Sequence, residues 1–296
     1  MDIRLVARPH DLDALARLFT VITDCDGHAP LGEHKYLDLL HAEPDQITGL
    51  VAEDAAGVVG YVALGPTQEM DTWALEFAIH PLHRHHKTTL TMVEAGVDWV
   101  EAKGGRTIRV WAFQPNLAEV LEECGFTPER ELRQLRRTLP AHPAPVFPPG
   151  IRGAAFRPGQ DEARWLAVNN AAFAGHPENG SWTREVLDDR MEQPWFDPDG
   201  FRMAWDGDLL AGFCWTKVHE SRLGEIYVIG VHPARQGSGM GRALTLEGMR
   251  FLREEAGLSK VMLYVDARNE PANALYDRLG FRLDHVDRSF VRFVGR

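Results

Sequence analysis

The chain has 296 residues, of which 44% are hydrophobic and 25% are charged, a composition typical of a globular protein with a substantial core. At about 150 residues per domain this length favours two domains. The sequence contains no run of about 18 apolar residues, so no membrane span is predicted. Its start does not resemble a signal peptide, so secretion is not predicted either. Three widely separated cysteines argue against a disulfide framework and favour a reducing cytoplasm, and a net charge of −11 argues against nucleic acid or membrane partners.

The first half, residues 1–139, is predicted to be one domain. It holds most of the acidity, because residues 1–140 carry 13 basic and 22 acidic side chains. A strand-like apolar run ends at His80-Pro81, and a helical stretch closes at Gly125-Phe126. Four histidines cluster after the strand-like run: His80, His83, His85 and His86. Their spacing lacks the further ligands of a structured metal site, so we interpret them as a basic, solvated loop.

Residues 140–150 are predicted to be a linker. Five of these eleven residues are proline, which favours extended polyproline geometry and cannot continue a helix or a central strand. A second domain, residues 151–296, follows the linker. Residues 141–296 are nearly neutral, with 19 basic and 21 acidic side chains.

The second half repeats motifs of the first in the same order, at an offset of about 150 residues. The paired motifs are Ile3-Arg4 and Ile151-Arg152, Gly60-Tyr61 and Gly212-Phe213, His80-Pro81 and His232-Pro233, and Gly125-Phe126 and Gly280-Phe281. Motifs repeated at this distance predict duplication of a whole domain rather than a solenoid.

The second half mixes helical and strand patterns. In chain order these predict a helix over 161–173, a hairpin of strands 201–205 and 209–216, a strand over 225–231, a helix over 241–255, a strand over 260–265, a helix over 271–279 and a strand region over 281–291. Alternation along 225–231 places Glu225, Tyr227, Ile229 and Val231 on one face. The sequence therefore predicts an α/β fold in which each domain has a buried mixed α+β sheet.

The most informative stretch is a glycine-rich turn, Gln236-Gly-Ser-Gly239-Met-Gly241, between the strand 225–231 and the helix 241–255. Glycines let backbone amides point into one concavity, and a helix start adds unpaired N–H groups and partial positive charge. Such a turn binds phosphate without a basic domain, and Arg235 and Arg242 could add charge. It matches neither the Rossmann nor the Walker pattern. The alternative is a solvent-exposed turn without a ligand.

The pattern Gln236-x-x-Gly239-x-Gly241 resembles the Q/R-x-x-G-x-G/A loop of the GCN5-related N-acetyltransferases (GNAT), and the later stretch 269–281 is similar to that family too. The resemblance implies two tandem GNAT domains that use acetyl-CoA as acetyl donor and need no metal. It implies that acetyl-CoA contacts three stretches: Ile229, Gly230 and Val231; Gln236, Gly237, Ser238, Gly239, Met240, Gly241 and Arg242; and Asn269, Glu270, Pro271, Ala272, Asn273 and Ala274.

Acetyl transfer to an amine needs a base for the ammonium, a donor for the thioester oxyanion and an acid for the departing thiolate. Glu225, an acid at the head of an apolar strand, is a candidate general base acting through water; the alternative is a solvent-facing strand end or a salt bridge. The family resemblance favours the base. It also implies that Tyr276 is the general acid, against the alternative of a packing tyrosine, and that amides of residues 229–231 bind the pantetheine arm.

The first domain lacks these features. Its loop over residues 84–89 contains no glycine, and alignment of the repeats puts Trp73 where Glu225 lies and Leu121 where Tyr276 lies. We therefore predict a degenerate, non-catalytic domain that binds acetyl-CoA weakly or not at all. The strand position of a second pantetheine site is occupied by Phe77, Ala78 and Ile79. We interpret these residues as the relic of such a site.

A tandem pair of such domains resembles the mycothiol synthase family of actinobacteria. The matching stretches are 172–183, 195–200, 215–219 and 224–231. The resemblance implies that the acceptor is the cysteinyl amine of Cys-GlcN-Ins, a pseudodisaccharide, and that the product is mycothiol. It also implies acceptor contacts from Glu178, Lys217, Glu225 and Tyr264, and from Glu33 of the first domain. A surface ion pair is the alternative for Glu178 and Lys217, and a helix-start acid for Glu33.

Two other functions stay open on the residues alone. A different amine, such as an aminoglycoside, a polyamine or a protein N-terminus, would use the same chemistry. A regulatory module that only binds acetyl-CoA would not be an enzyme, and the presence of both Glu225 and Tyr276 argues against it. We expect a cytoplasmic monomer.

Overall fold

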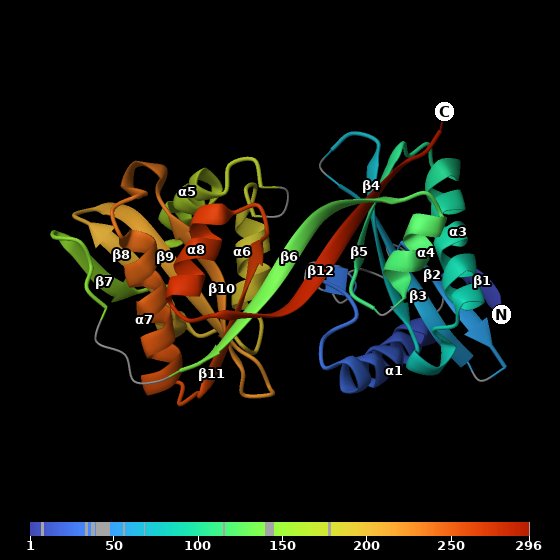
Figure 1. The fold of residues 1–296 in the computed structure, drawn as a ribbon, viewed down its shortest axis with the longest axis horizontal. Helices are drawn as coiled ribbons and strands as arrows, with labels where there is room; N and C mark the ends of the chain where they lie inside the picture. The colour runs from blue at the N-terminus through green and yellow to red at the C-terminus, as the bar shows by residue number, and fades with distance from the viewer. Residues whose placement is uncertain are drawn as a thin grey trace. The chain divides into compact units, whose positions relative to one another are not determined.

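The computed structural model describes residues 1–6, 9–32, 35–36, 39, 48–55, 57–67, 69–114, 116–139, 145–176 and 179–295 (Figure 1). Contacts divide the chain into two compact units. Unit 1 comprises Met1–Leu132 and Asp287–Arg296, and unit 2 comprises Arg133–Val286. Among the described residues, no helix is both long and apolar enough to span a membrane.

Unit 1 is built around a mixed sheet. Its elements in chain order are β1 (Asp2–Leu5), α1 (Pro9–Asp26), β2 (Gly49–Asp54), β3 (Gly57–Pro66), β4 (Thr72–Ile79), the 3-10 helix η1 (Pro81–His83), α3 (His86–Ala102), β5 (Thr107–Ala112), α4 (Leu117–Glu123) and β6 (Thr127–Thr138). Its strands follow the order β1-β2-β3-β4-β5-β12-β6. Strand β4 is parallel to β5 and antiparallel to β3.

Unit 2 repeats this plan. Its elements are β7 (Ile151–Ala155), α5 (Glu162–Ala172), α6 (Arg184–Met191), η2 (Pro198–Gly200), β8 (Phe201–Asp206), β9 (Leu209–Val218), β10 (Gly224–Val231), η3 (Pro233–Arg235), α7 (Met240–Glu254), β11 (Lys260–Asp266), α8 (Glu270–Arg278) and β12 (Arg282–Phe293). Its strand order is β12-β6-β11-β10-β9-β8-β7. The elements predicted for the second half and the mixed α/β fold are confirmed.

Each unit is completed by a strand from the other half of the sequence. From Asp287 onward, β12 belongs to unit 1, where it pairs with β5 and buries Phe290 in the core. From Arg133 onward, β6 belongs to unit 2, where Leu135 and Leu139 are buried. The units therefore differ from the predicted domains 1–139 and 151–296, because non-local strand pairing draws the boundary. Residues 140–144 of the predicted linker lie outside the described residues.

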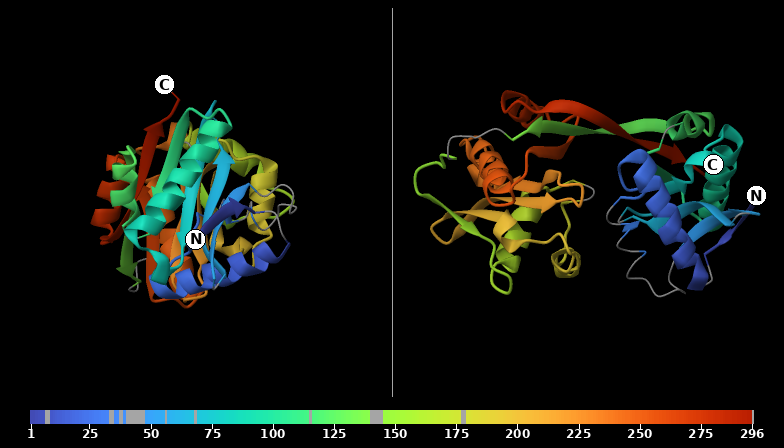
Figure 2. Two further views of the ribbon diagram at one scale, coloured as in Figure 1. Left: turned by 90° about the vertical axis from the view of Figure 1, so that its right-hand side faces the viewer. Right: turned by 90° about the horizontal axis from the view of Figure 1, so that it is seen from below.

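Helices cover both faces of the sheet in unit 2 (Figure 2). On one face, residues of α7 and α8 such as Leu244 and Tyr276 form a buried cluster. On the other, α5 and α6 cover an aromatic cluster in which the Phe201 and Trp215 rings stack with centroids 4.3 Å apart and Trp165 packs edge-on against both. A fully buried aromatic side chain contributes about 1.5–3 kcal/mol, so this cluster anchors β8 and β9 beside β10.

Strand β10 carries a bulge. Its register with β9 shifts between Ile226 and Val228, which makes Tyr227 the extra residue. Tyr227 and Val228 both pack on the α5 and α6 side, whereas Ile226, Ile229 and Val231 pack on the α7 side. The predicted common face of Glu225, Tyr227, Ile229 and Val231 is therefore wrong, since the bulge reverses the alternation after Tyr227.

The same bulge marks the point where two strands separate. The parallel register of β10 with β11 runs from Gly224↔Val261 to Ile226↔Leu263, whereas β10 continues to Val231 and β11 to Asp266. Residues 229–231 therefore lie on a part of β10 that is hydrogen-bonded to β9 on one side and diverges from β11 on the other. A backbone edge of this kind can bind an extended ligand.

Candidate active site

The glycine-rich turn lies between η3 and the start of α7. Gly237 and Gly239 have φ angles of 75° and 87°, values that favour glycine, and Gly239 is the N-cap residue of α7. A Cβ atom at either glycine would project into open space, and residues 234–239 are exposed. The unpaired amides of the helix start therefore face a region that a ligand can enter, which fits the pyrophosphate of acetyl-CoA.

Side chains of the turn hold its own backbone. Gln236 Nε2 donates to the Val231 carbonyl at 3.4 Å, and Ser238 Oγ donates to the Arg235 carbonyl at 2.6 Å. Arg235 forms an ion pair with Asp206, so its charge is already offset. Arg242 is exposed on the first turn of α7. The charge of Arg235 is therefore offset by its partner, whereas Arg242 presents its guanidinium to solvent beside the turn.

Residues 269–274 form the start of α8. Asn269 Oδ1 accepts a hydrogen bond from the Ala272 amide at 3.2 Å, which caps the helix. Asn273 Nδ2 donates to the carbonyls of Asp266 and Asn269 at 2.9 and 2.8 Å, tying the helix to the end of β11. Glu270, Pro271 and Ala274 lie on the same first turns. The sequence pattern at these positions therefore shapes the helix start.

Gly230 is required by packing. A Cβ atom there would lie 2.7 Å from the Phe213 ring of β9, so no larger residue fits without moving that ring. Its flanking residues Ile229 and Val231 are half-buried. The close approach at Gly230 is therefore made by a side chain of the neighbouring strand β9.

Glu225 is a buried carboxylate near the start of β10. It lies opposite Lys217 of β9 and opposite Met262 of β11. Its Oε2 is 2.7 Å from Nε2 of His219, in the turn that joins β9 to β10. A buried carboxylate needs such a partner. The solvent-facing strand end considered for Glu225 is excluded by this burial.

Lys217 and Tyr264 lie on the strands that flank Glu225. The Lys217 ammonium lies 4.4 Å from the centroid of the Trp195 ring and 5.3 Å from that of Tyr227, within cation–π range. Tyr264 Oη accepts a hydrogen bond from Gln134 Nε2 at 2.6 Å, and its side chain is partly exposed. The other two predicted acceptor contacts, Glu33 and Glu178, lie outside the described residues.

Tyr276 is buried on α8, with its ring edge-on to Phe281 at a centroid distance of 5.7 Å. Burial among apolar side chains raises the pKa of its phenol well above the ordinary value, and the neighbouring Cys214 adds to the effect. The phenol therefore keeps its proton throughout the neutral range. Tyr276 packs in the core and also retains the proton that an acid would donate.

Unit 1 differs at the corresponding turn. Arg84 takes the place of Gln236: its Nε donates to the Ile79 carbonyl at 2.9 Å, and its guanidinium pairs with Asp26 of α1 at 2.6 Å. Helix α3 starts directly after His85, whose φ of −81° is not left-handed. Gln114 Oε1 accepts the Ile79 amide at 3.1 Å, so a buried side chain occupies this amide of β4.

The alignment of the two halves is correct for the helix pair Leu121 and Tyr276. For the strand pair Trp73 and Glu225 it is wrong by one residue. The Leu121 carbonyl accepts the Phe126 amide just as that of Tyr276 accepts the Phe281 amide, so Leu121 stands where Tyr276 stands. Trp73 packs against Trp99 of α3. Because β4 pairs with β3 without a bulge, the residue opposite Gly65 is Ala74. Gly65 is the counterpart of Lys217, so Ala74, not Trp73, corresponds to Glu225.

Two of the clustered histidines of unit 1 contact different carboxylates. His83 Nδ1 lies 3.6 Å from Asp54, and His86 Nε2 lies 2.6 Å from Glu123. Within the described ranges, no group of three or more His, Cys, Asp or Glu side chains could hold a metal ion. Burial and the neighbouring His83 lower the pKa of His80.

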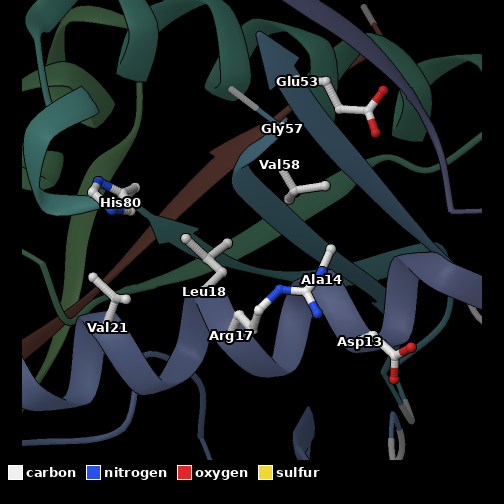
Figure 3. Close-up of a pocket in the computed structure, with 9 residues that line it drawn as sticks. All are labelled: Asp13, Ala14, Arg17, Leu18, Val21, Glu53, Gly57, Val58 and His80. Carbon is white, nitrogen blue, oxygen red and sulfur yellow. The ribbon is translucent and has the colours of Figure 1, made fainter. Parts of the chain in front are cut away.

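A cavity of about 380 Å³ also lies in unit 1, between α1 and the β2–β3 hairpin (Figure 3). It is lined by the aliphatic side chains of Leu18, Val21 and Val58 together with Glu53 and His80, among others. None of the predicted site residues lines it. We assign it no role in the chemistry.

Three contacts of this site were not predicted from the sequence. His219, Trp195 and Gln134 approach Glu225, Lys217 and Tyr264 respectively. His219 lies in the family-like stretch 215–219, but between the predicted strands 209–216 and 225–231, so the sequence gives no sign that its side chain meets Glu225. Gln134 could not be found from its own half, because it reaches unit 2 through the exchanged strand β6.

Comparison with known proteins identifies the family of this fold. Residues 165–281 match the model of the acetyltransferase (GNAT) family. The chain is 44% identical to mycothiol acetyltransferase of Streptomyces coelicolor, covering 94% of this chain and 91% of that protein. It is 40% identical to mycothiol acetyltransferase of Thermobispora bispora, covering 99% of this chain and 100% of that protein.

Solved structures share the fold of both halves. A tandem GNAT protein from the clavulanic acid biosynthesis pathway aligns with a TM-score of 0.76 at 16% identity, covering 100% of this chain and 99% of that one. A GCN5-related N-acetyltransferase from Sphaerobacter thermophilus aligns with a TM-score of 0.73 at 23% identity, over 98% and 95% of the two chains. The chain therefore belongs to the mycothiol acetyltransferase family of tandem GNAT proteins and is an acetyl-CoA-dependent N-acetyltransferase.

Proposed function

We propose that the chain transfers the acetyl group of acetyl-CoA to the cysteinyl amine of Cys-GlcN-Ins, which yields mycothiol. The observation that carries the proposal is the buried Glu225 carboxylate, paired with His219 on the strand that leads into the glycine-rich turn. The name shared by relatives that span nearly the whole chain supports the choice of acceptor. The catalytic site lies in the domain formed by the second half.

Three stretches would hold the donor. Amides of residues 236–242 would bind the pyrophosphate, the backbone of residues 229–231 would bind the pantetheine arm, and the first turns of α8 would border the thiol end. Acetyl-CoA supplies an activated thioester carbonyl. A backbone amide of β10 that diverges from β11 would donate to the oxyanion that forms on this carbonyl.

Two side chains would move the protons. Glu225 would take a proton from the cysteinyl ammonium through one water, so that the neutral amine attacks the thioester directly. Tyr276 would donate its phenolic proton to the departing thiolate as the carbon–sulfur bond breaks. The attacking nitrogen loses its second proton as the intermediate collapses, and this proton passes through water to the tyrosinate. The carboxylate and the CoA thiol therefore each gain one proton and the phenol is restored, so the step balances.

The acceptor carries one ammonium and many hydroxyl groups, and therefore needs polar contacts from several elements. Lys217 and Tyr264 flank Glu225 on the neighbouring strands and would supply two of them. Contacts from Glu33 and Glu178 stay predictions. We further propose that the first half is a degenerate, non-catalytic domain, because Ala74 replaces the carboxylate and Leu121 replaces the phenol.

The function is tested by incubating the protein with acetyl-CoA and a panel of amines, and measuring release of free CoA. Cys-GlcN-Ins is expected to give the highest kcat/KM, and the product should contain an N-acetylcysteinyl group by mass spectrometry. GlcN-Ins, which lacks the cysteinyl amine, is the matched control and should give no turnover. Preference for an aminoglycoside, a polyamine or a peptide N-terminus would replace the acceptor, and acetyl-CoA binding without any turnover would favour a regulatory module.

Titration calorimetry should detect one acetyl-CoA per chain, and Gly239→Val should weaken this binding by about tenfold or more. The expected loss has two causes: valine at φ 87° is strained, and its side chain would enter the space left for the ligand. Gly159→Val is the matched control, because Gly159 has φ 82° with open space around its Cβ position, in a turn before α5. Two binding sites in the wild type, or binding unchanged in Gly239→Val, would contradict the prediction.

A further inference from the structure

The contact between Glu225 and His219 spans a turn that is closed by backbone hydrogen bonds. His219 is the first residue after β9, and its amide donates to the Leu223 carbonyl at 2.9 Å. The Arg222 amide returns a hydrogen bond to the His219 carbonyl at 2.9 Å, with Arg222 in the left-handed region at φ 59°. These backbone bonds close the turn without the imidazole. The side chain of His219 is therefore not needed to form the turn.

The two side chains differ in their access to solvent. The side chain of Glu225 is 8% exposed and that of His219 is 31% exposed, while Nε2 and Oε2 are 2.7 Å apart. A base that takes a proton in every cycle must also release it, and a buried carboxylate has little direct contact with water to do so. His219 connects this carboxylate to the surface through one short hydrogen bond.

The charges around the pair come from several elements. Lys217 of β9 lies opposite Glu225, whereas β11 places the uncharged Met262 on the other side. Within the turn, Glu220 and Arg222 are exposed. Arg190 of α6 donates to Tyr227 Oη at 3.1 Å, beside the ring that Lys217 covers. Of the titratable groups named here, His219 is the one that hydrogen-bonds to Glu225, at a distance suited to proton transfer.

We propose that His219 is a positioning and relay residue that acts through Glu225, orienting its carboxylate and passing its proton to solvent. This inference rests on the proposed role of Glu225 as the base. After the acceptor ammonium has protonated Glu225, the O–H bond breaks and an N–H bond forms at Nε2 of the neutral imidazole in its Nδ1–H tautomer. The imidazolium then releases its Nδ1 proton to water, which restores the carboxylate and leaves a neutral ring whose Nε2–H donates to it. Exchange of the ring proton with water returns the Nδ1–H tautomer for the next cycle. No oxidant or further reactant is required.

The kinetic test compares His219→Gln and His219→Ala with the wild type. The glutamine amide introduced by His219→Gln can still donate to Glu225 but cannot take up a proton, so kcat should fall by about tenfold with an unchanged KM for acetyl-CoA and an altered pH profile. In His219→Ala, added imidazole should restore part of the lost rate, whereas it should not restore Glu225→Gln. A wild-type kcat and pH profile in His219→Gln, or a loss in His219→Ala that imidazole cannot restore, would overturn the relay.

A second measurement needs no acceptor. The ring nitrogens of His219 are observed by NMR in the wild type and in Glu225→Gln, where replacement of the carboxylate should change the chemical shift of Nε2. Identical Nε2 resonances in both proteins would overturn the pairing. This result is independent of the amine panel: failure to acetylate Cys-GlcN-Ins would remove the proposed acceptor, while the NMR spectra still decide whether His219 and Glu225 are in contact.

Discussion

Glu225→Gln is expected to lower kcat for acetyl transfer by about 10²- to 10⁴-fold, the range by which a general base accelerates such a step. Glutamine preserves the size of the side chain and keeps a hydrogen-bonding group beside His219, but it cannot accept a proton from the acceptor ammonium. The residual rate should rise with pH, because a larger fraction of the amine is then already neutral. Acetyl-CoA affinity should stay near the wild-type value, since the glycine-rich turn is unchanged.

Steady-state release of CoA across a pH series, combined with titration of acetyl-CoA, measures both quantities. Glu220→Gln is the matched control: Glu220 is exposed in the same β9–β10 turn, so its loss should leave kcat unchanged. Retention of full turnover by Glu225→Gln across the pH series would exclude Glu225 as the base. Loss of activity together with a large drop in melting temperature would instead assign it a structural role.

Tyr276→Phe is expected to lower kcat by about 10- to 100-fold while leaving acetyl-CoA affinity largely intact. The substitution removes the phenolic oxygen alone, so the ring can keep its contact with Phe281. Without the phenol, the thiolate must leave unprotonated or take its proton from water. The effect should therefore appear in the chemical step and not in binding.

The pH dependence of the wild type gives an independent check on Tyr276. Burial raises the pKa of this phenol, so Tyr276 stays protonated through the ordinary range of tyrosine ionisation. A fall in kcat caused by its ionisation should therefore appear only above that range. The stability of the fold should change with pH in the same direction. The core favours the neutral phenol, so the free energy of unfolding falls as pH rises above the pKa of an unfolded tyrosine.

Tyr61→Phe is the matched control for Tyr276→Phe. Tyr61 is a buried tyrosine of β3 in unit 1, and its replacement should leave kcat unchanged. A wild-type kcat in Tyr276→Phe would assign Tyr276 to packing alone. A rise in the dissociation constant of acetyl-CoA with unchanged kcat would move its role from proton donation to binding.

Local features of this protein could be predicted because their causes are local. Gly237 and Gly239 adopt positive φ angles that most other residues avoid. Their spacing before a helix therefore predicts the conformation of the turn from the sequence. The Asn269 cap depends on the residues that follow it within one turn. The repeat of motifs across the two halves likewise indicated two copies of one fold.

The strand register and the boundary between the two units were decided by hydrogen bonds between residues far apart in the chain. The bulge at Tyr227 arises from the register of β10 against β9, and it displaced the predicted counterpart of Glu225 from Trp73 to Ala74. The strand exchange moves the end of each half into the other unit, because an unpaired sheet edge is stabilised by whichever strand completes it. No composition pattern encodes that choice.

The sequence by itself determined the duplicated α/β fold and the glycine-rich turn, and it singled out Glu225 and Tyr276 as the candidate base and acid. The tertiary structure decided which side chains surround them: His219 reaches Glu225 across a turn, and Gln134 reaches Tyr264 from the exchanged strand. The physical reason is that turns and caps are set by the conformational preferences of a few adjacent residues, whereas strand register and burial depend on residues far apart in the chain.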